Sequence, residues 1–217
     1  MCSTCAYVFP YCDYTETQEH THIGSYNHVI VHDAYELTAA LNGFCLESPA
    51  RITIGSDFVL PEAVVISHPD IKISGRMRTL TATGGNALVI ADGAQLNLTR
   101  LALAGGYGHG SGIFVQGGSV YLRHIEISGF TNSGIRFEGP GGFVLVFAAY
   151  IHSNTADWGG GVHIAGVDSM FTMYDGVITS NEAAFGGGGV FLCGTSHFEI
   201  IRGLVYDNYA HLYGDLY

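Results

Sequence analysis

Basic residues are scarce in this chain. Its 217 residues include 8 Lys or Arg against 19 Asp or Glu, and the formal net charge at pH 7 is −11. Because the chain has so few basic side chains to neutralise a phosphate backbone, we expect no nucleic-acid partner. An acidic surface also repels uronic-acid polymers unless Ca²⁺ bridges the carboxylates, so neutral glycans or proteins fit better as ligands.

Long apolar segments are also missing. No stretch reaches the roughly 20 apolar residues that a membrane-spanning helix needs, so we expect no span. The first residues, MCSTCAYVFPYC, lack a basic region followed by an apolar run, and they do not resemble a secretory signal. A start inside a longer gene, an engineered boundary or a removed leader would each explain this.

Cysteine usage excludes a densely bridged extracellular scaffold, because five cysteines cannot all pair within one chain. Cys2, Cys5 and Cys12 are followed by His20 and His22, and these side chains supply enough ligands for one tetrahedral zinc ion. We take Cys2, Cys5, Cys12 and His20 as the candidate metal ligands. Their spacing matches no standard finger, so a disulfide from Cys2 or Cys5, or free thiols, is the alternative.

The sequence contains an internal repeat, in which three apolar columns recur with one shared set of intervals. The first column is Leu96, Val120, Val144, Phe171 and Phe198. The second is Leu98, Leu122, Val146, Met173 and Ile200. The third is Leu103, Ile127, Ile151, Ile178 and Val205. Repetition at a period of about 25 residues indicates a solenoid.

The repeating unit is built from strands. Apolar residues within it lie two apart, as in Phe171-Thr172-Met173, which is the strand period rather than the helix period. One coil runs through 159–185, with three strands near VHIA, FTMY and GVITS. We therefore predict an all-β fold, a three-sided, single-stranded parallel β-helix, and the usual rule for parallel crossovers makes it right-handed.

A short amphipathic helix is predicted ahead of the first coil. Asp33 and Glu36 have the spacing of a capping box, Leu37 and Ala40 share one face, and Gly43 ends the helix. Its apolar face would cover the open end of the solenoid. We divide the chain into a Cys- and His-containing segment, 1–32, and a capping helix plus β-helix, 33–217. Because 213–217 reads as the opening of a further coil, we expect truncation at this end.

Two further columns are interpreted as structural. One asparagine follows the third strand in each of the last three coils, where its side chain tolerates a turn and can bond to the next coil. These residues are Asn154, Asn181 and Asn208. Large apolar residues precede the glycine-rich openings and are expected to stack over that turn. They are Trp158, Phe185 and Leu212.

The glycine-rich openings also carry a family resemblance. GGGV at 159–162 and 187–190, with ITSN at 178–181, resembles the GGA(I/L) and FxxN motifs of polymorphic outer-membrane protein repeats. The position of the motif phenylalanine is held instead by Ile151, Ile178 and Val205. The resemblance implies a secreted or surface-attached bacterial adhesin with pectin-lyase-like coils.

An enzyme of the pectin-lyase-like fold is the alternative. Gly108-His109-Gly110 resembles the Gly-His-Gly element of polygalacturonase-type glycosidases, but the Asn-Thr-Asp, Asp-Asp and Arg-Ile-Lys partners are missing. Paired carboxylates are what glycoside hydrolysis requires. The candidate catalytic residues are Asp175, Asp207, Glu182 and His109.

The carboxylates have simpler interpretations too. Asp175 and Arg202 share an outward column on adjacent coils and are expected to form a surface ion pair. Asp207 and Glu182 would approach each other near the asparagine turn, where such a pair could bind Ca²⁺ or act as acid and base, although solvated surface charge is more common.

A ligand-binding face is predicted on one sheet. Alternation places Phe114, Arg136, His163 and Phe191 outward, and exposed aromatic residues flanking polar groups suit sugar rings or a partner protein. Burial under a loop or a neighbouring domain is the alternative for this column.

These observations favour a secreted or cell-surface scaffold for adhesion, with a glycan or a host or cell-surface protein as ligand and no cofactor required. Zinc or Ca²⁺ is the only metal that the sequence suggests. A polysaccharide lyase or glycoside hydrolase is the second function, and a spacer or filament that associates end to end is the third.

Overall fold

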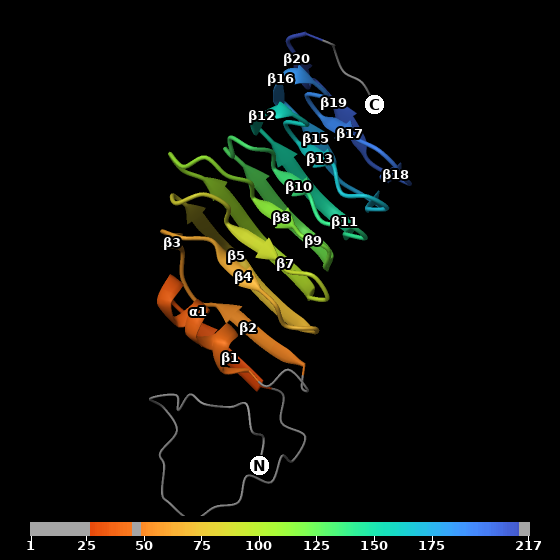
Figure 1. Cartoon of the computed structure of the whole chain (residues 1–217). Helices are drawn as coiled ribbons and strands as arrows, with labels where there is room; N and C mark the ends of the chain where they lie inside the picture. Colours follow the sequence, from red (N-terminus) through yellow and green to blue (C-terminus); the bar gives the residue numbers. More distant parts are fainter. Residues whose placement is uncertain (1–26, 45–48, 213–217) are drawn as a thin grey trace, which may run out of the picture.

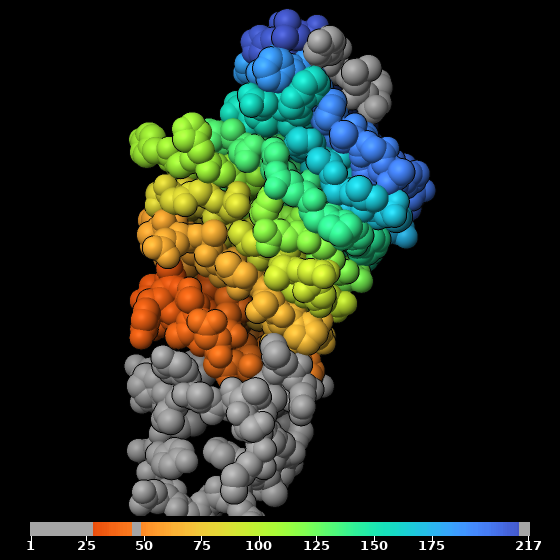
Figure 2. Space-filling view, viewed as in Figure 1, coloured from red at the N-terminus to blue at the C-terminus, as the bar shows by residue number. Residues whose placement is uncertain are grey.

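The computed structural model describes residues 27–44 and 49–212. Within them the chain forms a parallel β-solenoid of about seven turns with one helix, α1 (Ala34–Gly43). Figure 1 shows the coils stacked side by side, and in the space-filling view the sequence colours follow one another in bands along the long axis (Figure 2). The prediction of an all-β parallel solenoid is confirmed, and the structure is consistent with a right-handed parallel β-helix.

Three parallel sheets make up the solenoid. The largest contains β1 (Asn27–Val31), β2 (Ala50–Ile54), β3 (Phe58–Leu60), β5 (Ile71–Ala82), β7 (Gln95–Gly105), β9 (Ser119–Ser128), β11 (Phe143–His152), β14 (Met170–Met173), β15 (Val177–Thr179), β18 (His197–Ile200) and β19 (Leu204–Tyr206). The second contains β4 (Val64–Ile66), β6 (Leu88–Ile90), β8 (Ile113–Val115), β10 (Ile135–Phe137), β13 (Val162–Ile164) and β17 (Val190–Leu192). The third contains β12 (Thr155–Trp158), β16 (Glu182–Gly186) and β20 (Tyr209–Ala210).

The three apolar columns lie in register as predicted. Val144 pairs with Val120 on one side and with Phe171 on the other, and Ile178 pairs with Ile151 and Val205. Side chains in these columns are buried through most of the coils and together form one core along the solenoid axis. The burial of apolar surface between coils supplies the main favourable term for folding.

The long strands bend sharply once. In β7 the inward residues Leu98 and Leu101 are three apart, whereas a straight strand would place them on opposite faces. Arg100, between them, has φ of 53°, and His124 has φ of 56° at the same place in β9. One left-handed residue therefore turns the strand and keeps both halves facing the core.

The predicted helix is present at the N-terminal end. Asp33 caps it, because its Oδ1 accepts a hydrogen bond from the Glu36 N–H at 2.7 Å. Leu37 and Ala40 are buried against the first coils. The strand β1 precedes the helix, lies at the end of the segment 1–32, and pairs with β2. No helix in the described part of the chain is long and apolar enough to cross a membrane.

The asparagine column is a buried ladder. Asn181 Oδ1 accepts from the Asn154 N–H at 3.1 Å, and Asn208 Oδ1 accepts from the Asn181 N–H at 3.1 Å. The glycine-rich openings fit around it. A Cβ on Gly161 would lie 2.5 Å from the Gly189 carbonyl oxygen and 3.0 Å from Asn181 Nδ2, so glycine is required there.

Candidate functional site

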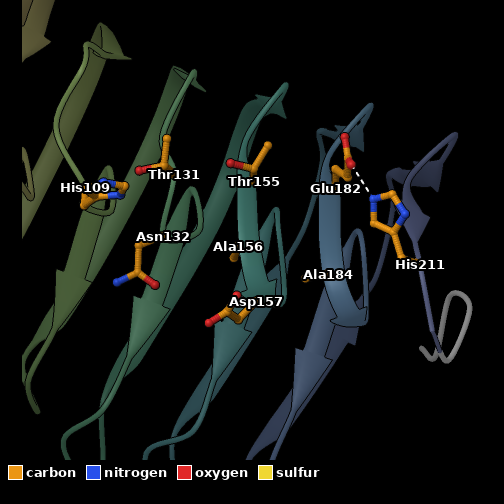
Figure 3. A pocket seen from close by; sticks show the side chains of 9 residues that line it. All are labelled: His109, Thr131, Asn132, Thr155, Ala156, Asp157, Glu182, Ala184 and His211. Carbon is orange, nitrogen blue, oxygen red and sulfur yellow. Dashed lines mark hydrogen bonds and ion pairs between the residues drawn. The ribbon is translucent and has the colours of Figure 1, made fainter.

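A groove of about 550 Å³ crosses the coils over the third sheet. It is lined by His109, Thr131, Asn132, Thr155, Ala156, Asp157, Glu182, Ala184 and His211. Figure 3 shows these side chains on neighbouring strands and turns, arranged in two rows that run across the strands. They belong to five successive coils, and four steps of about 4.8 Å give the groove a length of about 19 Å.

Register and small side chains explain the groove. Thr155 pairs with Glu182, and both side chains are exposed, so β12 and β16 present a polar residue to solvent at the same position. Asp157, Ala184 and His211 follow one another at equal intervals, one in each of three successive coils. Ala156 and Ala184 are half-buried, whereas the threonine and carboxylate side chains beside them are exposed. Two small alanine side chains thus line the groove among longer polar ones.

The walls carry acceptors and donors for hydrogen bonds. Glu182 Oε1 lies 2.5 Å from His211 Nε2, and both side chains are about half exposed. The Tyr209 ring packs edge-on against the His211 ring at 4.8 Å between centroids. Asp157 is exposed in the neighbouring coil. The groove therefore presents two carboxylates, two imidazoles and several hydroxyl and amide groups.

The structure places only two of the four candidate catalytic residues in the groove. His109 and Glu182 line the groove, whereas Asp175 and Asp207 are not among its lining residues. Asp175 is exposed, and its Oδ1 accepts from the Gly176 N–H at 2.8 Å. Asp207 is an exposed turn residue with φ of 51°.

The predicted ion pair between Asp175 and Arg202 is wrong. Arg136–Glu138, His152–Glu126 and His211–Glu182 are ion pairs of the described residues, and neither Asp175 nor Arg202 takes part in one. Asp175 bonds instead to the backbone of its own turn, which holds its carboxylate at the bend before β15.

Sequence reasoning missed Asp157 and His211 in the groove. Their column contains Asp157, Ala184 and His211, which share no residue type. The signal that could have found them is their equal spacing, which is the same as that of the asparagine ladder.

The predicted binding column is one continuous row in the second sheet. Arg136 pairs with Phe114 and His163, and His163 pairs with Phe191. The Arg136 guanidinium contacts Glu138 Oε1 at 2.6 Å and donates to Asn132 Oδ1 at 2.9 Å. Asn132 also lines the groove, so this row borders it.

Much of this row is covered by its own neighbours. His163 is 7% exposed, and Phe114, Arg136 and Phe191 are half-buried. The Trp158 ring packs on Phe191 at 4.6 Å, and Phe191 meets the His163 ring edge-on at 5.4 Å. The residues of this row therefore pack beside the groove and expose little surface of their own.

His163 is held neutral in the folded state. Burial, reinforced by the Arg136 charge and opposed by Glu138, lowers the pKa of His163 from 6.5 to about 4. Its Nδ1 lies 3.2 Å from Arg136 Nη1, which can only donate. Nδ1 therefore accepts, and the neutral ring carries its proton on Nε2.

The candidate zinc ligands Cys2, Cys5, Cys12 and His20 lie outside the described residues. Within the described ranges no group of three or more His, Cys, Asp or Glu side chains is arranged to hold a metal ion.

Comparison of the chain with protein-family models, with curated proteins and with solved structures found no match. Its function therefore has to be inferred from the chemistry of its own residues.

Proposed function

We propose that this protein is a binding scaffold that holds a neutral glycan chain in the groove over β12, β16 and β20. The observation that carries the proposal is a groove that runs across five coils and exposes polar side chains in each. A linear polymer laid along the solenoid axis would meet the same kind of contact about every 4.8 Å.

The chemistry of the walls favours sugar hydroxyls. Carboxylates such as Asp157 and Glu182 accept hydrogen bonds from hydroxyl groups, and hydrogen bonds to charged groups contribute about 1.5 to 3 kcal/mol each. The small side chains of Ala156 and Ala184 leave room for a sugar ring in the groove. Because the groove is acidic in a chain of net charge −11, a neutral glycan fits better than a uronic-acid polymer.

The resemblance of GGGV and ITSN to polymorphic outer-membrane protein repeats agrees with this role. On that basis we place the protein at the cell surface or among secreted proteins, where a rigid solenoid would display its groove to a glycan. A protein ligand is less suitable, because stable protein interfaces need a large, well-packed apolar centre that this groove lacks.

A polysaccharide lyase or glycoside hydrolase is the second candidate. It is favoured by the presence of His109, Asp157 and Glu182 in one groove, since a pair of carboxylates is the minimum for acid and base catalysis of glycoside cleavage.

One experiment separates the two functions. Purified protein is incubated with a panel of neutral oligosaccharides, with binding followed by calorimetry and cleavage by new reducing ends and unsaturated products. A scaffold binds without product, and Glu182→Gln weakens binding by about tenfold because a charged acceptor is lost. Product formation that Glu182→Gln or Asp157→Asn abolishes would establish the enzyme instead. Binding by neither wild type nor variants would reject both.

A further inference from the structure

The basic residues of this acidic chain are concentrated on one part of the surface. Six of its eight Lys and Arg residues lie on β2, β5, β7 and β9, and all six are exposed. They are Arg51, Lys72, Arg76, Arg78, Arg100 and Arg123. The two remaining basic residues are Arg136 and Arg202.

Four of the six are clustered at the bends of three neighbouring strands. We call Arg76, Arg78, Arg100 and Arg123 the arginine ridge. These residues lie at or beside the bends of β5, β7 and β9, which are hydrogen-bonded neighbours and lie side by side in Figure 1. Arg123 pairs with Thr99, the residue before Arg100, and adjacent strands are about 4.8 Å apart, so these arginines lie on neighbouring coils.

The backbone at the ridge favours glycine, yet the chain has basic residues there. Arg76 and Arg100 have φ of 51° and 53°, in the left-handed region, which costs free energy for any residue with a Cβ. In the later coils the corresponding bend includes Gly176 and Gly203, which also have positive φ. Met77 and His124 also have positive φ at these bends, so the turns accept several residue types, and the arginines among them are exposed to solvent.

None of the ridge arginines belongs to an ion pair of the described residues. Two carboxylates near the ridge, one before β3 and one on β9, have other partners. Asp57 Oδ1 accepts from the Thr79 N–H at 2.9 Å, and Glu126 Oε1 lies 3.1 Å from His152 Nε2. With four guanidinium groups against these two carboxylates, the ridge is a local positive surface on a negative molecule.

Aromatic rings continue the ridge. The Arg123 guanidinium lies 4.9 Å from the centroid of the Phe147 ring, and Phe147 stacks on Tyr174 at 5.6 Å with an interplanar angle of 11°. Phe147 and Tyr174 are each more than a third exposed. The stack offers flat apolar surface in line with the guanidinium groups.

We propose that the arginine ridge and the Phe147–Tyr174 stack bind a linear sulfated glycan. The guanidinium group of arginine can donate two parallel hydrogen bonds to two sulfate oxygens. The aromatic stack can pack against a sugar ring. The ridge spans three neighbouring coils and continues into the aromatic stack on the next coils, which suits a linear polymer laid along the solenoid axis better than a flat membrane. This site is separate from the groove, and it does not depend on the groove's ligand.

The test measures heparin affinity at low and at high salt. The triple variant R76S/R100S/R123S is expected to bind heparin about tenfold more weakly, and with a shallower salt dependence, because three cationic contacts are lost. Arg202→Ser is the matched control, since it removes one exposed arginine from the same corner of a distant coil, and it should bind as wild type does.

Arg100→Gly separates binding from folding. It removes a ridge cation but relieves the left-handed backbone, so the thermal midpoint should not fall while heparin affinity does. The proposal is overturned if wild type does not bind heparin at low salt, or if Arg202→Ser weakens binding as much as a ridge substitution. It is also overturned if oligodeoxythymidine or anionic vesicles bind the ridge more tightly than heparin does.

Discussion

At the residue scale, buried polar side chains tie the coils together. Asn181 is 1% exposed, and its Nδ2 donates to the Ile151 carbonyl oxygen at 3.0 Å and to Asn208 Oδ1 at 2.9 Å. Its Oδ1 accepts from the Asn154 N–H. One side chain thus links three successive coils, and each of these groups would be costly to leave unpaired in the core.

Asn181→Ala is expected to lower the free energy of unfolding by about 2 to 4 kcal/mol, because buried donors and acceptors of two neighbouring coils lose their partner. Urea unfolding followed by circular dichroism measures the change. Asn42→Ala, on an exposed position of α1, is the control and should change stability by less than about 0.5 kcal/mol. If Asn181→Ala lowered the free energy of unfolding by as little as the control does, the asparagine ladder would contribute little to stability.

His163 makes stability depend on pH. Its pKa is about 4 in the folded state and 6.5 in the unfolded chain, so the unfolded state binds more protons between these values. The contribution of His163 is complete above pH 6.5 and is lost as the pH falls towards 4. At about 1.4 kcal/mol per pKa unit, the loss is about 2 to 3 kcal/mol.

His163→Gln should remove this part of the pH dependence, because glutamine keeps an acceptor for Arg136 and does not titrate. Denaturant midpoints at several pH values from 7.5 to 4, compared between the two proteins, isolate His163 from the carboxylates that titrate in the same range. Parallel curves for wild type and variant would contradict the assignment of a neutral, buried imidazole.

At the element scale, the sequence is informative wherever apolar spacing is regular. The columns that contain Val144, Phe171 and Ile178 predict the strands and their register, since a strand-period pattern that recurs once per coil fits only a parallel stack. Asp33 likewise predicts the start of α1 because its side chain caps the helix, and Gly43 is the last helical residue, followed by Phe44 in an extended conformation.

The third sheet and the groove are harder to predict. The strands β12, β16 and β20 read TADW, EAAFG and YA, in which small residues replace the large apolar side chains that mark the other strands. The groove depends on the placement of side chains from five coils over two alanines. Apolar periodicity carries no information about that arrangement, and only the spacing of Asp157 and His211, equal to that of the asparagine ladder, points to them.

Asp33→Ala tests the helix that covers the N-terminal end. Loss of the 2.7 Å bond to the Glu36 N–H should cost about 1 kcal/mol and lower the melting temperature by about 2 to 4 °C. Asp33→Ser retains an oxygen acceptor at the cap and should recover most of the loss. Equal melting temperatures for the alanine and serine variants would show that the cap bond does not matter.

At the scale of the whole molecule, charge is segregated along the solenoid. The arginine ridge lies on β5, β7 and β9, whereas the carboxylates of the groove lie on the later strands β12 and β16. A rigid stack of coils can present two chemically different surfaces without bringing them into contact, because each coil touches only its neighbours.

The two proposed sites should therefore act independently. Ala184→Trp, which fills the groove, is expected to leave heparin affinity unchanged within about twofold, since distant sites without shared partners behave additively. The ridge variant R76S/R100S/R123S should likewise leave binding in the groove unchanged. Titrations of each variant with both ligands measure the coupling, and a large mutual effect would mean that one ligand occupies both surfaces.

The most direct test of a glycan-binding groove is calorimetric titration of wild type, Ala184→Trp and Ala102→Trp with the neutral oligosaccharide panel. Ala102 is a half-buried outward residue of β7, so Ala102→Trp adds the same side chain away from the groove. We expect wild type and Ala102→Trp to bind the same oligosaccharide with similar affinity, and Ala184→Trp to lose that binding. Equal binding by all three proteins, or binding by none, would contradict the assignment of the groove as a glycan site.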